Sequence, residues 1–154
     1  MKRYSDSEGL FIQAVVFMPS GLVQCLERGF LEFIKDRGLA ATLTALAKRV
    51  RDNPGCDKDE ALKLLQGCGD AISRDVILEC ATNHYDIGHT AGEAIATLDQ
   101  AVVNVEVAYL HRRLGYIAKA LSSANRAKVH RMGQEVVRIN DRLDALDDIT
   151  ETIH

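Results

Sequence analysis

The sequence predicts an all-α protein, a bundle of about six or seven helices that ends in a long antiparallel helical hairpin. Three observations lead to this prediction. Apolar residues recur every three or four positions along most of the chain, which is the spacing of one face of a helix. Glycine, proline and asparagine interrupt that spacing where turns are expected. Aromatic residues make up 5% of the chain, so Ala, Leu and Val must fill the core, which favours closely packed helices.

Length and composition favour a single helical domain over residues 1–154. The chain is 47% hydrophobic and 27% charged, as expected for an ordered globular protein. Residues 1–9 are mostly polar, and we expect them to form a short N-terminal arm.

Two helices are expected at the start of the bundle. The first carries an apolar stripe that includes Phe11 and Ala14, and it ends at Pro19, which cannot continue a helix. Ser20 can cap the second helix, and Gly38 is a natural C-terminal stop for it.

Three shorter helices are expected in the middle of the chain. Residues 39–50 carry the next apolar stripe, and residues 52–55 form the clearest turn. Asp57 begins a short helix that the glycines of residues 67–69 interrupt, and Asp70 caps the one that follows.

The last third of the chain predicts the hairpin. After a loop at residues 84–89, Thr90 and Glu93 form a capping box that opens a helix reaching about Leu121, roughly 48 Å long. Residues 122–125 make the turn. The final helix has heptad spacing, which is typical of helices packed lengthwise at a shallow angle. Its seam residues are Val129, Met132, Val136, Ile139, Leu143, Leu146 and Ile153.

Charge is distributed unevenly along the hairpin. The stretch from Val107 to Gln134 contains no acidic residue, whereas acids dominate the end of the final helix. The cations of this stretch flank the hairpin turn, and we call them the basic tip. They are Arg112, Arg113, Lys119, Arg126, Lys128 and Arg131.

A rigid scaffold with one basic surface favours binding over catalysis. We expect a small cytosolic protein-binding module, such as an inhibitor, an immunity-type protein, an adaptor or an assembly subunit, which docks through the basic tip onto an acidic protein face. The regular heptad seam of the final helix can also support a homodimer. The alternative is a nucleic-acid-binding helical subunit of a ribonucleoprotein, although the net charge of −3 leaves that role to a local patch.

A second alternative is a metal-binding protein. Cys80 and His84 are four residues apart and share a helix face, and His89 can close from the loop, with Cys68 upstream. Zinc suits this mixture of thiolate and imidazole ligands. The spacing is not a standard zinc motif, however, and a buried histidine at a helix end is the simpler interpretation.

Signals for an enzyme, a secreted protein or a membrane protein are weak. The segment at residues 67–69 is too short for a phosphate-binding loop, and the paired Glu-x-x-His motifs of di-iron bundles do not occur. Cysteines without CxxC pairs indicate reduced thiols in the cytoplasm. The apolar run from Leu10 to Met18 is too short to span a membrane, and acids precede it where a signal peptide would be basic. We therefore expect a cytoplasmic, non-enzymatic protein that does not insert into membranes.

Overall fold

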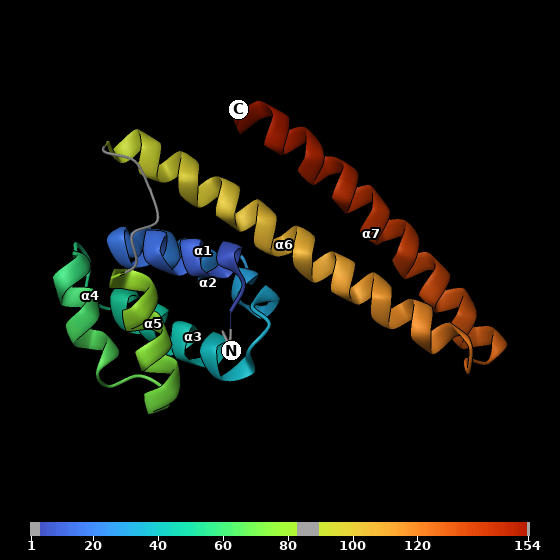
Figure 1. Ribbon diagram of the computed structural model, residues 1–154, viewed down its shortest axis with the longest axis horizontal. Helices are drawn as coiled ribbons and strands as arrows, with labels where there is room; N and C mark the ends of the chain where they lie inside the picture. The colour runs from blue at the N-terminus through green and yellow to red at the C-terminus, as the bar shows by residue number, and fades with distance from the viewer. Residues whose placement is uncertain (1–3, 83–89, 154) are drawn as a thin grey trace. The chain divides into compact units, whose positions relative to one another are not determined.

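The computed structural model describes residues 4–82 and 90–153, and within these ranges all regular structure is helical (Figure 1). The predicted all-α fold with a long C-terminal hairpin is confirmed. The elements are α1 (Asp6–Phe17), α2 (Pro19–Glu27), the 3-10 helix η1 (Phe30–Phe33), α3 (Arg37–Arg51), α4 (Lys58–Leu65), α5 (Ala71–Thr82), α6 (Ala91–Leu121) and α7 (Arg126–Ile153).

The chain divides into two compact units, residues 1–102 and residues 103–154, and the boundary falls inside α6. That the whole chain is one domain stays a prediction.

The expected N-terminal arm is wrong from residue 5 onward. Ser5 and Glu8 form a capping box, in which Ser5 Oγ accepts from the Glu8 amide at 3.1 Å and Glu8 Oε1 accepts from the Ser5 amide at 3.0 Å. Glu8 Oε2 also accepts from the backbone amide of Lys35 at 2.9 Å. This buried carboxylate therefore fixes the start of α1 to the segment that precedes α3.

The expected helix from Ser20 to Gly38 is also wrong. Pro19 is the first residue of α2, where a backbone N–H would have no intrahelical partner, so the N–H that proline lacks costs nothing. Gly29, with a φ of 70°, stops the chain from continuing as a helix after α2. Asp36 then caps α3 by accepting from the Leu39 amide at 3.0 Å, so Gly38 lies inside the first turn of α3. A glycine two residues after an N-cap resembles a helix stop in sequence, but the side chain of Asp36 marks this position as a helix start.

The core of the first unit lies where α1 and α3 meet their neighbours. α1 packs against α2, α4 and α5, and α3 packs against α2, α4, α5 and η1. The rings of Phe11 and Phe30 contact one another with their centroids 5.0 Å apart and their planes tilted by 53°. The largest fully buried side chains of this unit are Phe11, Ile12, Val15, Leu22, Ile34, Leu39, Leu43, Leu46, Leu65 and Ile77.

The first turns of α6 belong to this unit. Leu98 lies so close to Gly21 of α2 that a Cβ at Gly21 would be 2.7 Å from its Cδ2 atom. Ala94, Leu98 and Ala101 are buried and form one apolar stripe on the first part of α6. A separate stripe, which belongs to the second unit, begins at Val103. The shift follows from the change of packing unit along one helix.

Two arginines stabilise the connection between α4 and α5. Arg49 of α3 donates to the Gly67 carbonyl at 3.1 Å, and Arg74 of α5 donates to the carbonyls of Cys68 and Gly69 at 3.1 and 2.7 Å. These bonds satisfy carbonyl groups of the loop between the two helices, which have no helical partner.

Among the described residues, no single helix is long and apolar enough to cross a membrane. α1 and α2 together reach that length and composition, but they are bent by 116° at their junction.

Replacing Gly69 with Ala should destabilise the protein strongly. Gly69 has a φ of 57°, and a Cβ there would be 1.9 Å from Thr42 Oγ1 of α3. We expect the free energy of unfolding in urea to fall by about 2–5 kcal/mol, from left-handed strain and a steric clash together.

Gly55→Ala is the matched control. Gly55 has a φ of 79° but nothing within 4 Å of the added Cβ, so only the backbone term of about 1–2 kcal/mol applies. Equal losses in the two variants would contradict the packing of Thr42 on Gly69.

Candidate interaction surface on the helical hairpin

The second unit is an antiparallel pair formed by the second part of α6 and α7 (Figure 1). Its core is a seam of buried residues spaced seven apart on each helix. The seam residues are Val103, Leu110 and Ile117 on α6, and Met132, Ile139 and Leu146 on α7. The heptad predicted for the final helix is confirmed at Met132, Ile139 and Leu146, whereas Val136, Leu143 and Ile153 are only half-buried and Val129 is exposed.

Two bidentate ion pairs join the helices beside this seam. Arg142 Nε and Nη2 donate to the two carboxylate oxygens of Glu106 at 2.6 and 2.9 Å. Arg113 donates in the same way to Glu135, at 2.6 and 3.1 Å. The cation is on α7 in one pair and on α6 in the other, and the partners on each helix are seven residues apart. A slip along the hairpin would break both pairs and place like charges closer together.

The heptads place different chemistry on the two sides of the seam, because positions three and four after a seam residue flank it on opposite sides. The four residues of the ion pairs share one side, which we call the ion-pair side. The other side carries apolar residues that are half-buried or exposed, and we call it the open side. Its residues are Val107, Leu114 and Leu121 on α6, and Val129, Val136 and Leu143 on α7.

The ion-pair side is basic. Lys128 is seven residues before Glu135, and Arg131 and Arg138 lie four before and three after it, so all three share its side of α7. Arg113 lies over the ring of Tyr116, with its guanidinium carbon 5.0 Å from the centroid, and 60% of Tyr116 is exposed. Exposed cations and an exposed aromatic ring therefore lie together on one side of the hairpin.

The structure places the basic tip as the sequence predicts, around the turn, with one difference. Its members Arg112, Lys119, Arg126, Lys128 and Arg131 are exposed. Arg113 is half-buried and its guanidinium is committed to Glu135, whose side chain raises the pKa of Arg113 through their hydrogen bond. Arg113 therefore joins α6 to α7 through an ion pair, a contact that its sequence position did not reveal.

The start of α7 carries cations where a helix favours anions. Asn125 caps this end by accepting from the Lys128 amide at 2.9 Å. Arg126 and Lys128 stand in the first turn, which has no acidic residue. A positive charge beside the positive end of the helix dipole costs about 0.3–1 kcal/mol. Lys119, in the last turn of α6, is placed favourably for that helix.

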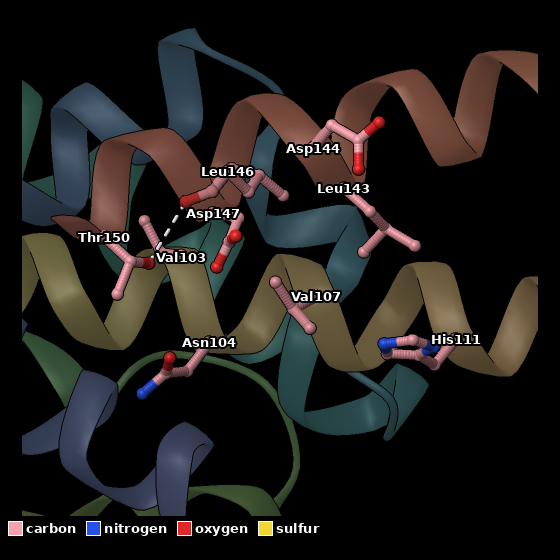
Figure 2. Close-up of a pocket in the computed structure, with 9 residues that line it drawn as sticks. All are labelled: Val103, Asn104, Val107, His111, Leu143, Asp144, Leu146, Asp147 and Thr150. Carbon is pink, nitrogen blue, oxygen red and sulfur yellow. Dashed lines mark hydrogen bonds between the residues drawn. The ribbon is translucent and has the colours of Figure 1, made fainter.

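A shallow cleft of about 290 Å³ lies on the open side near the end of α7 (Figure 2). Val107 and Leu143 form part of its apolar lining, and Asn104, His111 and Asp147 are among its polar residues. Thr150 Oγ1 donates to the Leu146 carbonyl at 3.1 Å, so this polar seam position is satisfied within its own helix. Figure 2 shows Asp147 between the two helices in this view.

The predicted zinc ligands are only partly described. Cys80 is fully buried in α5, whereas His84 and His89 lie outside the described residues. Cys68 is buried and its thiol donates to the Leu64 carbonyl at 3.3 Å. Within the described ranges, no three Cys, His, Asp or Glu side chains gather as a metal site would require. The zinc site stays a hypothesis.

Burial lowers the reactivity of the Cys25 and Cys68 thiols. None of the four cysteines, all of which are described, forms a disulfide. Burial raises the pKa of Cys25 to about 11, partly offset by Arg28. Burial likewise raises the pKa of Cys68, although the nearby charges of Arg49 and Arg74 lower it in part. These two thiols are protonated at neutral pH and are poor nucleophiles.

Comparison with protein-family models, with curated proteins and with solved structures gives no match. The function is therefore inferred from the residues of the hairpin itself.

Removing Arg142 should cost more stability than removing Arg113. The Glu106 side chain is 10% exposed and Glu135 is 29% exposed, so Arg142→Ala leaves the more deeply buried carboxylate without its cation. We expect Arg142→Ala to lower the free energy of unfolding by about 1–3 kcal/mol. Arg113→Ala should lower it by less than about 1 kcal/mol. Urea unfolding of both variants tests the order, and the reverse order would contradict the burial of Glu106.

Acid should remove the contribution of the Arg113–Glu135 pair. The hydrogen bond from Arg113 holds the pKa of Glu135 below its ordinary value. The stabilisation is therefore fully present above the unfolded pKa, about 4.3, and is lost as the pH falls through the lower folded value. Glu135→Gln should unfold more easily than wild type at pH 7, and the two should converge as the pH falls below the lowered folded pKa of Glu135. A stability difference that persists unchanged in acid would argue against this pair.

Proposed function

We propose that this protein is a small binding protein that docks through its basic tip onto an acidic face of another protein. The observation that carries the proposal is the start of α7, where Arg126 and Lys128 stand in the first turn without an acidic neighbour in that turn. This placement opposes the helix dipole and lowers the stability of the hairpin. A binding role explains cations that folding itself disfavours.

The hairpin suits such a role because it is rigid. The buried seam and the two bidentate ion pairs keep α6 and α7 in one register, so the backbone positions that carry the cations of the tip are fixed relative to one another. Preorganised charges lose less conformational entropy on binding, and they steer an oppositely charged partner during its approach.

We propose further that the protein acts in the cytoplasm and that it binds its partner without catalysing a reaction. The buried, protonated thiols of Cys25 and Cys68 suit structural use in a reducing compartment. Inhibitors, immunity-type proteins, adaptors and assembly subunits all act by binding of this kind.

Charge reversal at the tip tests the proposal. Lys128→Glu with Arg131→Glu should abolish capture of the natural partner from a lysate of the source cells, because both cations are exposed and neither takes part in the described ion pairs of the hairpin. The matched control is Lys58→Glu with Lys63→Glu on α4, two exposed lysines whose reversal changes the net charge equally. Bound proteins are identified by mass spectrometry.

The proposal predicts one or more proteins that wild type and the α4 variant retain and the tip variant loses. With the purified partner, the tip variant should associate at least about tenfold more slowly at low salt. A partner that all three proteins retain equally would place the interface elsewhere. Loss of RNA or DNA, in place of a protein, from the tip variant would replace this function with nucleic-acid binding.

A further inference from the structure

The open side of the hairpin leaves an apolar stripe only partly covered. Leu121 and Val129 are 38% and 42% exposed, and Val107, Leu114, Val136 and Leu143 are half-buried. The ion-pair side carries cations and carboxylates, whereas the middle of this stripe carries no formal charge. Such a stripe is typical of a surface that another helix layer covers.

A second column of residues runs beside this stripe on α7. Its members, spaced seven apart, are Arg126, Gly133, Asn140 and Asp147. One end of the column is cationic, the other end is anionic, and its middle is small and uncharged. Reversing the direction of the column therefore places opposite charges together at both ends.

We propose that the open side binds the open side of a second copy of this chain, with the two hairpins antiparallel. A two-fold axis at the level of Leu114 and Val136 makes each of these residues meet its own counterpart. It also places Val129 opposite Leu143 of the other copy, and Arg126 opposite Asp147. The resulting contact is isologous, as in most homodimers.

The charges favour a second copy over an unrelated partner, because the surface is complementary to itself. Arg126 of one copy would reach the cleft where Asp147 and Asp144 of the other lie, next to the apolar surface of Val107 and Leu143 (Figure 2). Its methylene groups can pack on that surface while its guanidinium pairs with a carboxylate. The same pairing occurs at both ends by symmetry.

The size of the surface also suits a dimer. From Arg126 to Asp147 the helix is about 33 Å long, and two helices of about 10 Å width offer about 660 Å² per copy. The total, about 1,300 Å², falls within the roughly 1,200–2,000 Å² of standard stable interfaces.

Gly133 is consistent with close approach of a second helix. A Cβ at this position would meet nothing within 4 Å, so no contact within the chain requires glycine there. Glycine inside a helix costs roughly 0.5–1 kcal/mol relative to alanine. A helix packed over this position would offset that cost by approaching more closely.

Gly133→Glu and Gln134→Glu, made in the full chain, form a matched pair. Both add one negative charge to α7, but residue 134 is turned about 100° further around the helix and points away from the open side. We expect wild type and Gln134→Glu to be dimers in sedimentation equilibrium, and Gly133→Glu to have a dissociation constant at least about tenfold higher. Glutamate is a better helix former than glycine, so thermal unfolding of dilute monomer should show an intact fold.

A charge swap tests the antiparallel direction independently. Arg126→Asp and Asp147→Arg should each weaken the dimer, and the double variant should restore it, because opposite charges again meet at both ends. A wild type that stays monomeric up to about 100 µM would overturn the proposal. Equal dimerisation of the Gly133→Glu and Gln134→Glu variants, or a double variant no tighter than the singles, would also overturn it.

This inference shares only Arg126 with the proposed function, and the two are tested with different variants. Lys128→Glu with Arg131→Glu alters the ion-pair side, so it should abolish partner capture and leave the dimer intact. The oligomeric state is measured on the purified chain alone, and failure of either proposal therefore leaves the other standing.

Discussion

The register between α6 and α7 is the constraint on which the hairpin depends. Three buried residues on each helix set its spacing, and the two ion pairs of opposite direction make the register specific. Hydrophobic burial supplies most of the stabilisation, since a seam of Val, Leu, Ile and Met side chains is removed from water. The ion pairs add less energy. A shift in register, however, would leave the buried carboxylate of Glu106 without its cation, and the cost of that unpaired charge disfavours other registers of α6 against α7.

The same register separates two kinds of surface. A heptad seam has two flanks, and here one flank holds the charged pairs and further cations, whereas the other holds a partly exposed apolar stripe. A single pair of helices therefore presents cations on one flank and a largely apolar stripe on the other, and Arg126 of the basic tip lies beside that stripe. The cations in the first turn of α7 oppose its dipole, which lowers the stability of that helix.

Local signals in the sequence were enough to predict most helices from Arg37 onward and their caps, because these depend on neighbouring residues, whereas the start of α1 and the bounds of α2 were not predicted correctly. Asp57, Asp70 and Thr90 each accept from a backbone amide three residues on, as the capping patterns predict. The non-local features were missed. The bond from Glu8 to the Lys35 amide spans 27 residues, and no local pattern indicates it. Likewise, the basic tip was visible as a run of charge, but the commitment of Arg113 to Glu135 depends on the hairpin register and could not be predicted from composition.

The most direct test of this account is a double-mutant cycle on Glu106 and Arg142, using Glu106→Gln, Arg142→Ala and the double variant, with the free energy of unfolding measured for each. The account predicts a favourable coupling energy of about 1 kcal/mol or more, because the two side chains contact one another beside the seam. A coupling energy near zero would mean that the two residues do not meet, and it would contradict the register from which both surfaces follow.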